Sequence, residues 1–151
     1  MLSRTADNLY WLSRYMERAE ATLRIVRCLC ARMMEPDSMT GGGRQSTTRL
    51  VRMLTAWGAV PADMAEASMA EIAAAALHDK DQLGSATSIA SAARRAAGVI
   101  RERLSPDAWH LLRSLDQRLA QEEGKALPEA EAFDKADGAQ INVIPFLHIA
   151  C

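Results

Sequence analysis

Aromatic side chains are scarce in this chain, and it contains no long apolar run and no excess of charge of either sign. Phe, Trp and Tyr together make up 5% of its 151 residues, whereas Ala, Leu, Arg, Glu and Met are abundant, which favours helix over sheet. No segment reaches the roughly 18 consecutive apolar residues of a membrane span. The formal net charge is −1, so no overall charge draws the chain to nucleic acid or to an anionic membrane. These absences predict a soluble helical protein.

Cysteine and histidine are too few and too scattered to predict a metal site or a cofactor. The three cysteines are Cys28, Cys30 and Cys151, and the three histidines are His78, His110 and His148. Cys28 and Cys30 would point about 200° apart on a helix, so they cannot share a metal ion. At the N-terminus, Arg4 and Asp7 stand where a signal peptide needs an apolar core. We expect reduced thiols, a cytoplasmic location, no metal and no cofactor.

The first 35 residues predict one long amphipathic helix. Its apolar stripe, with alternating steps of three and four residues, consists of Leu9, Leu12, Met16, Ala19, Leu23, Val26, Cys30 and Met33. This spacing is typical of a helix that buries one face against the rest of a bundle. The helix is expected to end near Glu35, because Pro36 disfavours the α conformation of the residue before it.

A second stripe on this helix is polar and aromatic, which is unusual beside a buried face. It contains Arg4, Asn8, Trp11, Tyr15 and Arg18. Guanidinium groups next to aromatic rings are the chemistry of anion recognition or of a protein interface. Alternatively, the rings pack on neighbouring helices while each arginine pairs with a carboxylate there. The stripe positions favour Arg18 pointing inward with Tyr15 and Trp11.

The remaining face of the helix predicts a docking surface made of Arg14, Glu17, Glu20 and Arg24. Glu20 and Arg24 are spaced to pair at i and i+4 in the favourable order. Glu17 points about 100° away from Arg18 and outward with Arg14. The adjacent Glu17 and Arg18 are therefore interpreted as part of a docking surface and a structural latch, and no catalytic residue is assigned.

Shorter helices are expected downstream, over residues 49–57, 65–77 and 87–104. Another begins at Pro106, after Ser105 as N-cap. The glycines at positions 41–43 lack the Lys and the preceding strand of a phosphate-binding loop, so they predict a flexible connector. Residues 94, 95, 101 and 103 are arginines spread around one helix. They favour a solvated face, with recognition of a carboxylate or phosphate as the alternative. The fold class is all-α, a bundle of about five helices with an irregular C-terminal tail.

The opening sequence MLSRTADNLYWLSRYMERAE resembles the start of the bacterial alpha-E domain family, with its Glu-Arg signature at Glu17–Arg18. TSIASAARRAAGVIRERLSPDAW is similar in its order of helix signals, but it has Arg94–Ala97 where the family tends to show Glu-Asn-Ala-Arg. The resemblance covers about residues 1–120, and the family is about twice as long. Residues 1–121 are therefore predicted to form a partial alpha-E-like domain. The polar and then apolar residues 122–151 are interpreted as a docked terminal strand, a segment that pairs with another chain, or a truncated or replaced continuation of the domain.

The resemblance implies an accessory role beside ATP-grasp-like ligases and transglutaminase-like peptidases in peptide or amide-bond modification. The first hypothesis is a non-catalytic interaction module that docks such partners through the first helix. The alternative is an anion- or peptide-binding enzyme component that uses Arg4, Tyr15, Glu17 and Arg18. Self-association is also expected, because half a bundle exposes apolar surface. Nucleic acid and membrane are not expected partners.

Overall fold

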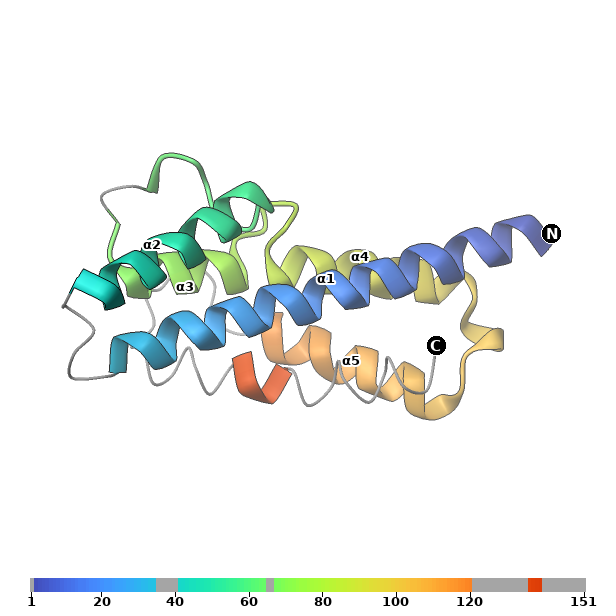
Figure 1. The fold of residues 1–151 in the computed structure, drawn as a ribbon. Helices are drawn as coiled ribbons and strands as arrows, with labels where there is room; N and C mark the ends of the chain where they lie inside the picture. The colour runs from blue at the N-terminus through green and yellow to red at the C-terminus, as the bar shows by residue number, and fades with distance from the viewer. Residues whose placement is uncertain (1, 35–40, 65–66, 121–135, 140–151) are drawn as a thin grey trace.

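The computed structural model describes residues 2–34, 41–64, 67–120 and 136–139 (Figure 1). Its helices are α1 (Leu2–Met34), α2 (Gly41–Ala56), α3 (Met69–His78), α4 (Ala86–Val99), the 3₁₀ turn η2 (Arg101–Arg103) and α5 (Pro106–Ala120). The described part of the chain contains no strand. The expected all-α bundle with a long first helix is confirmed.

Helix α1 is the axis on which the other helices pack. Its 33 residues give it a length of about 50 Å. Helices α2 and α3 lie along its C-terminal half, and α4 lies along its N-terminal half with α5 packed against α4 (Figure 1). No helix in the described residues is long and apolar enough to cross a membrane.

The apolar stripe of α1 forms the centre of the core, as the spacing predicts. Its buried members are Leu12, Met16, Ala19, Leu23, Val26 and Cys30. Among the stripe residues whose side chains the structure describes, Leu9 is the exception, with 36% of its surface exposed. Leu9 lies beside Val99, the last residue of α4, in the lining of one hollow. The partner helix therefore ends where Leu9 would need cover.

The glycines at positions 41–43 belong to helix α2, so the expected flexible connector is wrong. Glycine has a low helix propensity, yet α2 runs from Gly41 to Ala56 and packs along α1. Leu54 on this helix is fully buried. Tertiary packing of an amphipathic face supplies most of a helix's stability and overrides the local propensity.

Two other helix boundaries also differ from the expected ones. Helix α3 begins at Met69, because Ser68 is extended and forms a capping box with Glu71. Helix α4 ends at Val99, and the chain continues as the 3₁₀ turn η2. The start of α5 is as predicted, with the Ala108 N–H donating to Ser105 Oγ at 3.2 Å.

One turn of the C-terminal region, residues 136–139, packs on the core. Ala136 and Ala139 are fully buried, and Asp137 lies 3.0 Å from an Arg27 guanidinium nitrogen in an ion pair. Cys151 and His148, the last cysteine and the last histidine of the chain, lie outside the described residues.

Candidate functional site

Three members of the polar and aromatic stripe of α1 line one groove against α4. Trp11, Tyr15 and Arg18 form its α1 wall, and the groove has a volume of about 530 Å³. We call it the α1–α4 groove. Arg18 is exposed and Trp11 is 53% exposed, so the prediction that both point inward is wrong. Helix α4 packs on the neighbouring apolar stripe and leaves these side chains at its edge.

The opposite wall of the groove comes from α4 and from the loop before it. Its polar members are Lys80, Thr87, Ser88, Ser91 and Arg95, with Leu83 and Ala92 between them. Sequence reasoning missed these residues, and it assigned Arg95 to a solvated face. The sequence feature that could have identified this wall is the spacing of Ser88, Ala92 and Arg95, which places them on one side of a helix.

The loop that carries Lys80 and Leu83 is held by three hydrogen bonds. Ser85 Oγ donates to the carbonyl oxygen of Asp79 at 2.6 Å, and Ser88 Oγ donates to that of Lys80 at 3.3 Å. The Gly84 N–H donates to the carbonyl oxygen of Gly58 at 3.0 Å. The loop side of the groove is therefore fixed to the ends of α2 and α4.

The aromatic rings of the groove form a stacked pair. The ring centroids of Trp11 and Tyr15 are 6.0 Å apart with an interplanar angle of 30°. Tyr10 meets Trp11 edge-on at 5.3 Å. Exposed aromatic surface of this size is typical of a binding site, because a folded chain gains by covering it.

The charge of the groove is positive. Arg18 and Arg95 have no carboxylate within ion-pair distance among the described residues, and Lys80 adds a third cation. No Asp or Glu belongs to the described lining. The neighbouring Arg94, in contrast, pairs with Asp116 at 2.5 Å. An anion could therefore meet the guanidinium groups of Arg18 and Arg95 in this groove.

The family model that matches this sequence covers residues 1–141 and is described as a predicted alpha-helical domain with a conserved ER motif. The chain belongs to the Alpha-E family. The match extends beyond residue 121, where the sequence places the end of the domain. No curated protein and no solved structure matches the chain.

Glu-Arg occurs twice in this Alpha-E chain, at Glu17–Arg18 and at Glu102–Arg103. The two members of the first pair diverge, as predicted. Glu17 lies outside the groove and accepts a hydrogen bond from Arg14 at 2.9 Å, whereas Arg18 lines the groove. Arg18 is thus the member of this pair that can meet a ligand in the groove.

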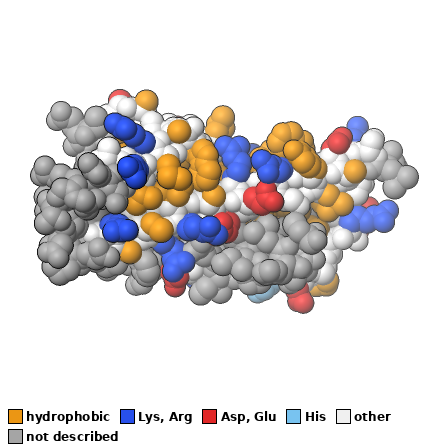
Figure 2. Space-filling view, viewed as in Figure 1, with side chains coloured by type: hydrophobic (Ala, Val, Ile, Leu, Met, Phe, Trp, Pro, Cys, Tyr) orange, Lys and Arg blue, Asp and Glu red, His pale blue; other side chains and the backbone are white. Residues whose placement is uncertain are grey.

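The predicted docking surface of the Alpha-E chain carries two ion pairs within α1. Arg14 pairs with Glu17 at 2.9 Å, and Arg24 pairs with Glu20 at 2.6 Å. Basic and apolar side chains lie next to one another along the length of α1 in the view of Figure 2. Arg14, Glu17 and Arg24 are exposed, and Glu20 is half-buried.

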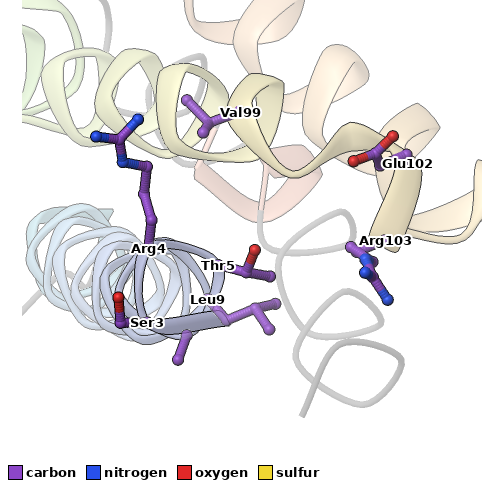
Figure 3. A pocket seen from close by; sticks show the side chains of 8 residues that line it. Ser3, Arg4, Thr5, Leu9, Val99, Glu102 and Arg103 are labelled. Carbon is purple, nitrogen blue, oxygen red and sulfur yellow. The ribbon is translucent and has the colours of Figure 1, made fainter. Parts of the chain in front are cut away.

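The remaining two stripe residues lie nearer the N-terminus of α1. Arg4 lines a second hollow of about 770 Å³, together with Leu9, Val99, Glu102 and Arg103. Figure 3 shows the Arg4 side chain reaching from α1 toward α4, while Glu102 and Arg103 come from the turn that follows α4. Asn8 is half-buried, and its Nδ2 donates to the carbonyl oxygen of Arg4 at 2.8 Å.

The described residues contain no group of three side chains placed to hold a metal ion. His78 is buried, and its Nδ1 donates to the carbonyl oxygen of Leu119 at 2.8 Å, which ties α3 to α5. Cys28 is exposed and Cys30 is buried. The arrangement as a whole can bind an anion and stack on a planar group.

Proposed function

We propose that this chain holds a carboxylate-bearing peptide or small molecule in the α1–α4 groove, as an accessory component of peptide or amide-bond modification. The observation that carries the proposal is the meeting of three cations and two stacked rings in one groove without a carboxylate in its described lining. Arginine binds a carboxylate through two parallel hydrogen bonds, and aromatic faces add stacking area. This geometry favours ligand binding over docking alone.

The proposed role is binding and presentation of the ligand. The described lining of the groove contains no carboxylate, histidine or cysteine that could act as base or nucleophile. Its hydroxyl groups belong to Tyr15, Thr87, Ser88 and Ser91, and the described lining places no carboxylate or imidazole beside them to act as base. The Ser88 hydroxyl is also engaged with the backbone carbonyl oxygens of Asp79 and Lys80. A catalytic partner would then supply the reacting groups.

The partners proposed for this role are of the ATP-grasp-like ligase and transglutaminase-like kinds that the family resemblance implies. A ligase of that kind activates a carboxylate, so a module that holds carboxylate ligands suits it. The outward face with Arg14, Glu17, Glu20 and Arg24 is the proposed contact. Its Arg14–Glu17 ion pair is solvent-exposed and worth little by itself, so it can be exchanged for pairs with a partner. Co-purification from cells tests this contact by comparing the natural chain with the double variant that carries Arg14→Ala and Glu17→Ala. Equal recovery of a ligase with the two chains would rule the contact out.

Calorimetric titration with the dipeptide Ala-Glu tests the groove directly. We expect Arg18→Gln and Arg95→Gln each to weaken binding about tenfold, because each removes a charge-assisted pair of hydrogen bonds. Arg24→Gln is the matched control, since Arg24 also lies exposed on α1 but pairs with Glu20 outside the groove.

Circular dichroism of each variant verifies that the helices are retained. Loss of binding in Arg24→Gln equal to that in Arg18→Gln would show that the dipeptide follows net charge and not the groove. Failure of Ala-Glu, together with failure of larger glutamyl peptides, to bind the natural chain would refute the proposed function.

A further inference from the structure

The α1–α4 groove lies where one stripe of α1 changes from covered to open. Toward the C-terminus of α1, this stripe continues as Thr22, Ile25 and Leu29, which are buried. Helices α2 and α3 lie along this half of α1 (Figure 1). In the N-terminal half, the same stripe holds Trp11, which is 53% exposed, and Arg18, which is exposed. Only part of a continuous stripe is therefore packed under other helices.

Helix α2 ends at the level of α1 where the open part of the stripe begins. Just after the end of α2, the carbonyl oxygen of Gly58 accepts the Gly84 N–H at 3.0 Å. The Thr22 hydroxyl in turn donates to the carbonyl oxygen of Gly84 at 3.5 Å. From Thr22 toward the N-terminus, Arg18 is about one turn away and Trp11 about three. The groove thus occupies the place of a helix that would continue α2 end to end along α1.

The walls of the groove favour a helix as its occupant. The backbone N–H and C=O groups of α1 and α4 are paired within these helices, so they offer no edge to an extended chain, whereas a helix pairs its own backbone groups. On α4, the half-buried Ser88, Ser91 and Ala92 are small, which allows a packed helix to approach to an interaxial distance of about 8 Å. The distance along α1 from Arg18 to Trp11 is about 10 Å, or two helical turns.

Arginines stand on both walls of the groove. Helix α4 runs antiparallel to α1 from the contact between Gly84 and Thr22 (Figure 1). Arg95 is as many positions after Gly84 as Trp11 is before Thr22, so these two residues lie at the same level of the two helices. Arg18 lies about two turns away on the α1 wall. The two guanidinium groups are therefore placed on opposite sides of the groove.

The side chains of the lining select an acidic amphipathic partner. Leu83 is 88% exposed at the loop end of the groove, and Trp11 presents a ring at the other end. Apolar side chains at i, i+3, i+4 and i+7 of a bound helix would cover both, and carboxylates beside them would meet Arg18 and Arg95. A second copy of this chain, bound about a two-fold axis at the groove, would instead bring the same cations against one another.

We propose that the carboxylate-bearing peptide of the α1–α4 groove is an acidic amphipathic helix of a partner protein, packed on α1 and α4 end to end with α2. The inference rests on the proposed function and deepens it, since it gives the bound peptide a conformation and a residue pattern. An apolar stripe covers Trp11 and Leu83, and a carboxylate on each flank of that stripe reaches Arg18 on one wall and Arg95 on the other.

Calorimetric titration of three peptides of 14 residues with blocked ends tests this inference. The acidic peptide has leucine at positions 4, 7, 8 and 11, glutamate at positions 3, 5, 10 and 12 on the two flanks of the leucine stripe, and alanine or glutamine elsewhere. The second peptide has proline at position 9, on the opposite face, and the third has glutamine in place of every glutamate. We expect the acidic peptide to bind at least tenfold more tightly than either of the others. Proline breaks the helix without removing a contact, and glutamine removes the charge-assisted hydrogen bonds.

Substitutions in the chain separate the charged from the apolar contacts. Arg18→Gln and Arg95→Gln should each weaken binding of the acidic peptide about tenfold and leave that of the glutamine peptide unchanged. Trp11→Ala should weaken binding of both peptides, because it removes apolar contact area. Arg24→Gln is the matched control, since Arg24 pairs with Glu20 outside the groove. Circular dichroism verifies that each variant retains its helices.

Equal binding of the proline peptide would overturn the helical occupant, and equal binding of the glutamine peptide would overturn its acidic character. If Ala-Glu binds and the acidic peptide does not, this inference fails and the carboxylate site stands; if neither binds, the proposed function fails as well. Sedimentation of the chain alone tests the second copy. A dimer that Trp11→Ala converts to a monomer would show that a second copy fills the groove, and the partner-helix proposal would fail.

Discussion

At the scale of single residues, Gly84 occupies a position at which no side chain fits. A Cβ at this position would meet the carbonyl oxygen of Trp57 and would lie 2.7 Å from the carbonyl carbon of Gly58. These are backbone atoms, which cannot move aside cheaply. The close approach lets the Gly84 N–H reach Gly58 and places its carbonyl oxygen near Thr22 Oγ1 at 3.5 Å. Gly84 therefore locks the loop beside the groove to α1 and α2.

Replacing Gly84 with alanine should destabilise the chain by about 2–3 kcal/mol, because the added methyl group overpacks a backbone contact. Urea denaturation followed by circular dichroism measures the change. The variant should also bind Ala-Glu more weakly, since Lys80 belongs to the same loop.

Gly98→Ala is the control for this prediction. A Cβ at Gly98 would meet no atom within 4 Å, and the residue lies inside α4, where alanine has the higher helix propensity. Stability should rise by up to about 1 kcal/mol. A similar loss in both variants would contradict the close-contact explanation for Gly84.

At the scale of secondary-structure elements, side-chain caps decide where α3 and α4 begin. Ser85 is buried, accepts the Ser88 N–H at 3.3 Å, and donates to the carbonyl oxygen of Asp79. Ser68 caps α3 in the same way, through the Glu71 N–H at 3.2 Å, but it is exposed to solvent. The two caps therefore differ mainly in burial.

Ser85→Ala should lower the free energy of unfolding by about 2 kcal/mol, since it removes a buried cap and leaves the carbonyl group of the half-buried Asp79 with one donor fewer. Ser68→Ala should cost about 1 kcal/mol or less, because water can replace the lost bond. Thermal and urea unfolding of the two variants give the comparison. A larger loss for Ser68→Ala would refute the role assigned to burial.

The helix ends show which elements local signals can predict. The start of α5 at Pro106, after Ser105 as N-cap, follows from capping chemistry within a few residues. The structure confirms this start. The end of α4 does not follow in this way. Ile100 and Leu104 continue the apolar spacing of the helix, and Ile100 is buried as this spacing predicts. The helix nevertheless ends there, because Ile100 is the C-cap of α4 and the chain continues as η2. The apolar pattern predicts which side chains face the core, but not whether a continuous helix carries them there.

At the scale of the whole molecule, residues 136–139 belong to the same core as α1. Ala136 and Ala139 are fully buried in the main apolar cluster. The sequence places the domain end at residue 121, and the family match runs to residue 141. Because residues 136–139 pack on the core, substitutions in this turn measure how much it contributes to the stability of the fold.

Ala136→Asp should destabilise the chain by more than about 3 kcal/mol, because it places an unpaired carboxylate in the core. Asp137→Asn removes an ion pair whose two side chains are each at least one-third exposed, so it should cost less than about 1 kcal/mol. Both values come from denaturant unfolding at constant pH. A neutral effect of Ala136→Asp would show that the turn does not dock in solution, and that residues 1–121 suffice for the fold.

The sequence by itself determined the long first helix, the buried stripe from Leu12 to Cys30, the start of α5 and the divergence of Glu17 from Arg18. Each follows from local spacing or capping chemistry along one element. Only the tertiary structure decided that Trp11, Tyr15 and Arg18 line a groove. Their stripe lies directly beside the buried one, so its exposure depends on how much of α1 the partner helix covers. The facing surface of α4 carries small side chains such as Ser88, Ser91 and Ala92. Small side chains leave this edge open, and no pattern within α1 contains that information.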